Sequence, residues 1–219
     1  IAQGIPLLYG STGEIITQKS GNMNLGIPGV MYVGGICGVI GAFLYEQSLP
    51  TPAAMNPFLA VLIPTLFCLL GSLLMGLLFC FLTVTLRANQ NVTGLALTTF
   101  GVGLMKVIMS KVDAAVYLVG PKKLYRFPFA GRTDSLQCLG VMFFLAVIIA
   151  LLASYILYRT KIGLHLRAVG ENPATADAAG INVTVYKYLA TCIGAMIAGL
   201  GGLYYVMDYA CGVWTNDAF

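Results

Sequence analysis

Residues 136–158, which read LQCLGVMFFLAVIIALLASYILY, decide the fold class because they contain no charged side chain. An α-helix that crosses the hydrocarbon core of a bilayer needs roughly 20 consecutive apolar residues. The stretch from Leu136 to Tyr158 meets this length, and Arg159 and Lys161 follow it with positive charge. The sequence therefore predicts a membrane-spanning helix here.

Four further apolar stretches have the length of a spanning helix. They are Leu25–Tyr45, Pro57 to about Thr85, Asn91 to about Ser110, and Tyr188–Met207. The first is rich in glycine and contains Pro28, which suggests a broken or re-entrant helix. Ile1–Gly10 is apolar but short, so we expect it to be the tail of an earlier span. The pattern predicts an all-α, polytopic transmembrane helical bundle that forms one domain over residues 1–219, and the start at Ile1 suggests a fragment of a longer protein.

The composition agrees with a lipid environment. Hydrophobic residues make up 58% of the chain and charged residues 9%, against roughly 45–50% and about 25% in soluble domains. The net charge of +4 resides in loops and helix ends. It is interpreted as anchoring to membrane lipid and not as a footprint for nucleic acid. With one histidine, His165, and no CxxC spacing, no metal site is expected.

Lysine and arginine do not orient the chain by the positive-inside rule. With these spans, one side carries Lys19, Arg87, Arg159, Lys161, Arg167 and Lys187, and the other carries Lys106, Lys111, Lys122, Lys123, Arg126 and Arg132. The two sides hold equal numbers, so the count decides nothing.

The connection between the last two spans, residues 159–187, is long and polar for a helical hairpin. Asn172 is a good N-cap, Pro173 suits the first helical position, and Gly180 suits the left-handed residue that ends a helix. The sequence predicts a short, alanine-rich helix from Pro173 to Ala179 outside the membrane. Because so short a helix is marginal alone, we expect it to dock on a partner protein, unless it merely closes a loop at the interface.

Three blocks of sequence resemble one family. Residues 166–181, LRAVGENPATADAAGI, look like the cytoplasmic coupling segment of ABC permeases of the ribose and branched-chain amino-acid superfamily. Gly13-Glu14, Lys19-Ser20-Gly21 and Asn24–Gly29 resemble that family's first block, and residues 86–97, LRANQNVTGLAL, resemble the turn after its long helix. The closest resemblance is to the simple-sugar or nucleoside branch, although that branch often has glutamate where this chain has Pro28.

This resemblance implies a type II-like ABC importer permease fold with the C-terminal spans missing. It implies that the segment 159–187 is a cytoplasmic coupling loop, in a chain of the bacterial cytoplasmic membrane that imports a simple sugar or nucleoside. The residues expected to contact an ATP-binding subunit are Arg167, Ala168, Val169, Gly170, Glu171, Asn172, Pro173, Ala174, Ala176, Ala179 and Gly180. Ala176→Trp is expected to leave the protein folded and to uncouple ATP hydrolysis from transport.

The implied partners are that ATP-binding subunit, a second permease subunit of different sequence, and an extracytoplasmic substrate-binding protein. The chain contains no GxxxxGK[ST] motif. Since this motif cradles the phosphates of ATP, we expect ATP and Mg²⁺ on the partner, no cofactor on this chain, and no enzyme activity.

Polar side chains at membrane depth are candidates for the translocation path. They are Glu14, Asn24, Gln90, Asn91 and Thr93. Each could instead make an interhelical hydrogen bond or cap a helix. An ion-coupled secondary transporter is the alternative function, but it would need intramembrane carboxylates, which are scarce here. An intramembrane enzyme lacks a convincing nucleophile–base pair.

Overall fold

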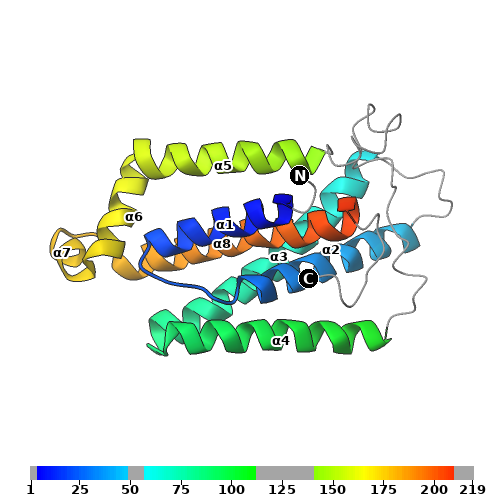
Figure 1. Cartoon of the computed structure of the whole chain (residues 1–219), viewed down its shortest axis with the longest axis horizontal. Coiled ribbons are helices and arrows are strands. Elements are labelled where there is room, and N and C mark those ends of the chain that lie inside the picture. The colour runs from blue at the N-terminus through cyan, green and yellow to red at the C-terminus, as the bar shows by residue number, and fades with distance from the viewer. Residues whose placement is uncertain (1–3, 49–56, 112–140, 210–219) are drawn as a thin grey trace.

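The computed structural model describes residues 4–48, 57–111 and 141–209, and every regular element in these ranges is helical (Figure 1). In chain order the α-helices are α1 (Gly4–Lys19), α2 (Ile27–Gln47), α3 (Pro57–Cys80), α4 (Gln90–Lys111), α5 (Val141–Arg159), α6 (Lys161–Glu171), α7 (Pro173–Ala178) and α8 (Val183–Tyr204). Two π-helical turns, η2 (Phe81–Thr85) and η6 (Tyr205–Tyr209), extend α3 and α8. Five helical segments of the described ranges are long and apolar enough to cross a membrane.

The long helices lie side by side, with α8 among α1, α2 and α3 (Figure 1). Helix α4 packs on α2 at one side, and α5 packs on α1 at the other. Helices α6 and α7 lie together at one end of the bundle, between the end of α5 and the start of α8. We call this the α7 end.

Small residues let the central helices approach closely, as their four-residue spacing in the sequence predicts. They are Gly34, Gly38 and Ala42 in α2, and Gly194, Ala198 and Gly202 in α8. A methyl group on Gly13 of α1 would lie 3.2 Å from the Cβ of Ala198 in α8. One on Gly34 of α2 would lie 2.8 Å from the Cα of Gly199. Larger side chains would force these helices apart, so the glycines define the contact between α8 and its neighbours.

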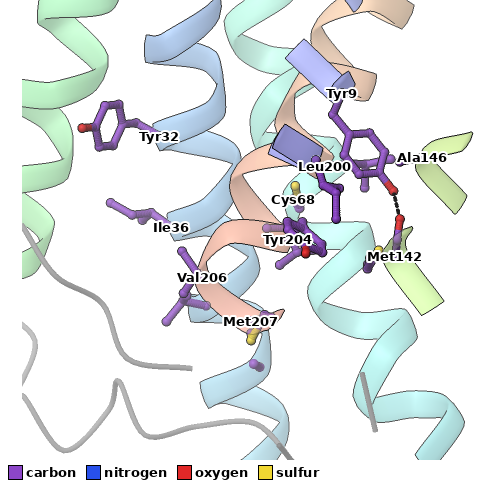
Figure 2. Close-up of a cluster of buried hydrophobic side chains, with 14 of the residues drawn as sticks. Tyr9, Tyr32, Ile36, Cys68, Met142, Ala146, Leu200, Tyr204, Val206 and Met207 are labelled. Atoms are coloured by element: carbon purple, nitrogen blue, oxygen red, sulfur yellow. Dashed lines mark hydrogen bonds between the residues drawn. The ribbon is translucent and has the colours of Figure 1, made fainter. Parts of the chain in front are cut away.

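A buried apolar cluster joins the long helices α1, α2, α3, α4, α5 and α8 and the turn η6 (Figure 2). Tyr9 of α1 is 1% exposed, and its hydroxyl donates a hydrogen bond of 2.7 Å to the main-chain carbonyl of Met142 in α5. Tyr204 of α8 and Cys68 of α3 lie in the same cluster. The bond satisfies a polar hydroxyl inside an apolar region and ties α5 to the rest of the bundle.

The predicted spans are recovered with shifted ends. Pro57–Thr85 is α3 with η2, and Asn91–Ser110 falls within α4. The stretch Leu136–Tyr158 corresponds to α5, although residues 136–140 lie outside the described ranges. Tyr188–Met207 corresponds to α8 and η6, but α8 begins earlier, at Val183, and its first turn is capped by Asn182.

One expectation about the N-terminal part is wrong. The stretch Leu25–Tyr45 is not broken: α2 is continuous, because Pro28 lies in its first turn, where no helical amide is lost. The apolar stretch Ile1–Gly10 belongs, from Gly4 onward, to a longer helix than expected, because α1 continues to Lys19. That this stretch is the tail of an earlier span stays a prediction. The hydroxyls of Thr12 and Thr17 donate to carbonyls one turn back, which lets a partly polar helix lie inside the bundle.

Candidate functional site

The local structure of α7 follows from its two ends. The backbone of Asn172 is extended, at φ −145° and ψ 95°, and its side-chain oxygen accepts from the amides of Ala174 (3.2 Å) and Thr175 (3.3 Å). Pro173 occupies the first turn. At the other end Gly180 has a φ of +81°, and its amide donates to the carbonyl of Asp177 at 2.9 Å. The predicted caps are therefore confirmed, and the helix ends at Ala178, one residue earlier than expected.

Helix α6 was not predicted within the polar connection. Thr160 caps it by accepting from the amide of Gly163 at 3.3 Å, and Asn172 ends it while starting α7. Its Leu166 and Val169 are buried, whereas Ile162 is 63% exposed. Apolar residues at positions 162, 166 and 169, behind a threonine cap, are the signal that would have found this amphipathic helix.

Close contacts fix α6 to the bundle. A methyl group on Gly21, in the loop after α1, would lie 3.2 Å from the Cα of Gly170 in α6, so the two backbones touch. His165 Nδ1 and the Tyr186 hydroxyl lie 3.0 Å apart, which links α6 to α8. The guanidinium of Arg167 lies 5.5 Å from the ring centroid of Tyr158 in α5. These contacts hold α6 to α1, α5 and α8, so α7 projects from a firmly seated base.

The outer face of α7 borders an open hollow of about 580 Å³. Pro173, Ala174 and Asp177 line one side, and Gly180, Ile181, Asn182, Val183 and Thr184 line the rest. The three α7 residues are exposed to solvent. Together, the capped helix and the shallow hollow beside it form a shaped surface that is open to solvent.

Not every predicted contact residue faces outward. Val169 is fully buried and Ala176 is 3% exposed, so both side chains support the segment from inside. Ala176→Trp is therefore unsuitable as a probe of docking, because an indole at this position would displace α7 itself. Arg167, Ala168 and Gly170 are partly buried, whereas Glu171, Asn172, Pro173, Ala174, Ala179 and Gly180 are exposed.

Three of the five predicted path residues are linked by the loop of residues 20–26 at the α7 end. Asn24 lies in this loop, and Glu14 and Gln90 bond to it. Glu14 Oε1 accepts from the amide of Asn24 at 3.0 Å, and Gln90 Oε1 accepts from the amide of Met23 at 2.9 Å. The loop is thereby bonded to both α1 and α4. Glu14 Oε2 is buried and has no hydrogen-bond partner among the described residues.

The other two predicted path residues lie in the first turn of α4. Asn91 is exposed, and its amide donates to Asn89 Oδ1 at 3.0 Å, whereas Thr93 is 8% exposed. Sequence reasoning missed Asn22, which is 1% exposed and donates from Nδ2 to the hydroxyl of Thr191 at 3.3 Å. Asparagine in a loop carries no signal of burial, so only the packing against α8 reveals it.

Comparisons with known proteins identify a family and its relatives. A family described as "Branched-chain amino acid transport system / permease component" matches residues 1–219. The chain is 31% identical over 208 residues to the nucleoside ABC transporter permease protein NupC of Lactococcus lactis, covering 91% of this chain and 63% of that protein. It is 30% identical over 217 residues to the guanosine ABC transporter permease protein NupQ of Bacillus subtilis, covering 94% and 65%.

A third relative is the putative glucose ABC transporter permease protein TsgC13 of Haloferax volcanii, 30% identical over 212 residues, with coverage of 93% and 60%. The chain thus spans less than two thirds of the length of these three relatives. No solved structure matches the chain.

Proposed function

Because the chain belongs to the permease family of the branched-chain amino acid transport system, we propose that it is the membrane-spanning part of an ABC importer subunit. A separate ATP-binding subunit binds ATP and Mg²⁺ and drives the transport. In this proposal the α7 end faces the cytoplasm of a bacterial cell, and α7 docks on the ATP-binding subunit. The observation that carries the proposal is the exposed α7, capped at both ends and seated on the bundle through α6.

The seating of α6 gives a physical reason why docking can affect transport. Movement of α7 displaces α6, because Asn172 is both the C-cap of α6 and the N-cap of α7. Gly170 of α6 touches the loop at Gly21, and the same loop carries Asn24, whose amide is bonded to Glu14. A shift of α7 therefore reaches polar groups inside the bundle through contiguous contacts. Coupling requires that these contacts differ between two states of the importer.

The substrate class follows from the relatives by analogy. NupC and NupQ are named for nucleosides and guanosine, and TsgC13 for glucose. We propose a nucleoside or a simple sugar as the transported solute, delivered by an extracytoplasmic binding protein, with a second permease subunit completing the path. An ion-coupled transporter is the weaker alternative, because α1 to α5 contain only two acidic residues, Glu14 and Glu46, and Glu46 lies at the end of α2.

The test uses the full-length protein, reconstituted in vesicles with its ATP-binding subunit, second permease and binding protein. Ala174→Trp places an indole on the exposed face of α7, and Ala88→Trp places the same group at an exposed position between α3 and α4 as the control. We expect Ala174→Trp to lower substrate-stimulated ATP hydrolysis by about tenfold, on the order of 1.4 kcal/mol of docking free energy, and Ala88→Trp to leave it nearly unchanged. Normal stimulation in a folded Ala174→Trp protein would refute docking through α7.

Two further measurements separate the alternatives. Uptake that requires ATP inside the vesicles supports the importer, whereas uptake driven by an ion gradient without ATP supports the secondary transporter. Calorimetric titration of the binding protein with nucleosides and simple sugars identifies the substrate class.

A further inference from the structure

Three consecutive residues of the loop of residues 20–26 contact three different helices. Gly21 touches α6, Asn22 is bonded to α8, and Met23 is bonded to α4. Figure 1 shows this loop running from the end of α1 across α8 to the start of α2. It therefore joins α6, the helix that carries α7, to α4 at the side of the bundle away from α5.

The contact with α6 is made between backbones. A methyl group on Gly170 would overlap the carbonyl oxygen of Lys19 and lie 3.1 Å from the amide nitrogen of Gly21. Gly21 has a φ of +83°, and this left-handed conformation turns the chain out of α1. Because main-chain atoms meet here with no side chain between them, α6 cannot move toward the end of α1 without displacing the loop.

The bond to α8 fixes the middle of the loop. Asn22 is 1% exposed, and its Nδ2 donates to the hydroxyl of Thr191 at 3.3 Å. Thr191 is fully buried in α8, the helix that lies among α1, α2 and α3. Leaving a buried amide without its acceptor is unfavourable. The loop is therefore held more firmly at Asn22 than at its exposed neighbours Gly21 and Met23.

Helix α4 contacts the loop through its first turns. Gln90 Oε1 accepts from the amide of Met23 at 2.9 Å. A methyl group on Gly94 would lie 2.8 Å from the amide nitrogen of Leu25, and the Thr98 hydroxyl donates to the carbonyl of Leu25 at 3.3 Å. All these contacts are made to main-chain atoms of the loop, so a displacement of the loop acts directly on the start of α4.

We propose that residues 21–23 form a lever that passes movement of α6 to α4. Asn22 is its fixed point, and Gln90 is the positioning residue through which the lever engages α4. The proposal rests on the proposed docking of α7, which supplies the movement of α6. It gives Gln90 a role in coupling ATP hydrolysis to transport, through the position of α4 in two states of the importer.

The first test measures coupling in variants of Gln90. The full-length protein is reconstituted in vesicles with its ATP-binding subunit, second permease and binding protein, and the ratio of solute taken up to ATP hydrolysed is determined. Gln90→Leu removes the acceptor of the Met23 amide. We expect the ratio to fall about fivefold, because the loss of one ordinary hydrogen bond shifts a two-state equilibrium by about this factor.

A rescue variant and a matched control accompany this measurement. Gln90→Glu keeps an acceptor oxygen in the first turn of α4, where a helix stabilises a carboxylate, so it should restore most of the ratio. Gln18→Leu makes the same chemical change at an exposed position of α1 and should leave the ratio unchanged.

The fixed point is tested in the same assay. Thr191→Val removes the acceptor of Asn22 and should lower the ratio as Gln90→Leu does. Thr191→Ser keeps the hydroxyl and should retain most of the ratio. If Gln90→Leu fails to assemble, the comparison of Thr191→Val with Thr191→Ser decides the outcome.

A second measurement follows the movement itself by hydrogen exchange of the assembled complex, with and without ATP. In the unsubstituted complex, ATP should change the exchange of peptides from α6 and from the start of α4. In Gln90→Leu the change in α6 should remain, whereas the change in α4 should be lost. If Gln90 only stabilised α4, its loss would alter exchange in α4 equally with and without ATP.

An unchanged ratio in Gln90→Leu would overturn the lever, as would a change in α4 on ATP binding that persists in this variant. A ratio that is equally low in Gln90→Glu would contradict a role through the bond to Met23. If ATP drives no uptake by the unsubstituted complex, the importer function itself fails, so the two failures are distinguishable.

Discussion

Removing the N-cap of α7 should loosen this helix without unfolding the bundle. In the unsubstituted protein Asn172 Oδ1 accepts from the amides of Ala174 and Thr175 at 3.2 and 3.3 Å. In Asn172→Ala both amides lose this acceptor. These amides belong to the first turn, where no carbonyl of the helix can replace it. The loss of such a cap costs about 1 kcal/mol.

The expected effect is local because α7 has only six residues. A helix of this length has little stability of its own, so about 1 kcal/mol shifts its opening equilibrium by about fivefold. The left-handed turn at Gly180 and the buried Ala176 remain, so the helix is weakened and not abolished. Hydrogen exchange followed by mass spectrometry should show about fivefold faster exchange for peptides that contain α7.

Two control variants sharpen this measurement. Asn172→Ser keeps a side-chain oxygen at the cap, so its exchange should stay close to that of the unsubstituted protein. Asn182→Ala removes the equivalent bond to Val185 at the start of α8, and it should leave α7 unaffected. Unchanged exchange of α7 in Asn172→Ala would contradict the view that this side chain holds the helix.

Other variants test the packing of the bundle. Gly194→Leu should lower the free energy of unfolding by about 3 kcal/mol in chemical denaturation, because α1 leaves no room for the side chain. Gly103→Leu is the control and should have little effect, since nothing lies within 4 Å of a methyl group added there. Tyr9→Phe should lose about 1 kcal/mol in the same assay, since the carbonyl of Met142 loses a buried donor. Glu14→Ala should slow substrate uptake while leaving binding of the ATP-binding subunit intact, and unchanged uptake would argue against a role of this carboxylate in transport.

The spanning helices and α7 were predictable because their signals are local. A span is defined by a run of apolar residues, as in 141–159, and this property does not depend on neighbouring helices. The ends of α7 depend on Asn172 and Gly180, which act on amides and carbonyls a few positions away. Such bonds form wherever the backbone turns in this way.

The errors arose where packing against distant residues decides the structure. Helix α1 contains enough polar residues to escape a search for spans, yet it is accommodated by α8, which approaches it at Gly13. The amphipathic α6 had a local signal that was overlooked, but its packing against α1, α5 and α8 depends on residues far apart in the chain. The burial of Ala176 was missed for the same reason.

The sequence by itself determined that this protein is a helical membrane bundle and that a short capped helix interrupts its last polar connection, because hydrophobic runs and caps act over neighbouring residues. Only the tertiary structure decided which side of that helix is exposed, how α6 holds it to the bundle, and that Glu14 and Gln90 bond to the same loop. These features depend on contacts between segments far apart in the chain, and no local pattern encodes which segments meet.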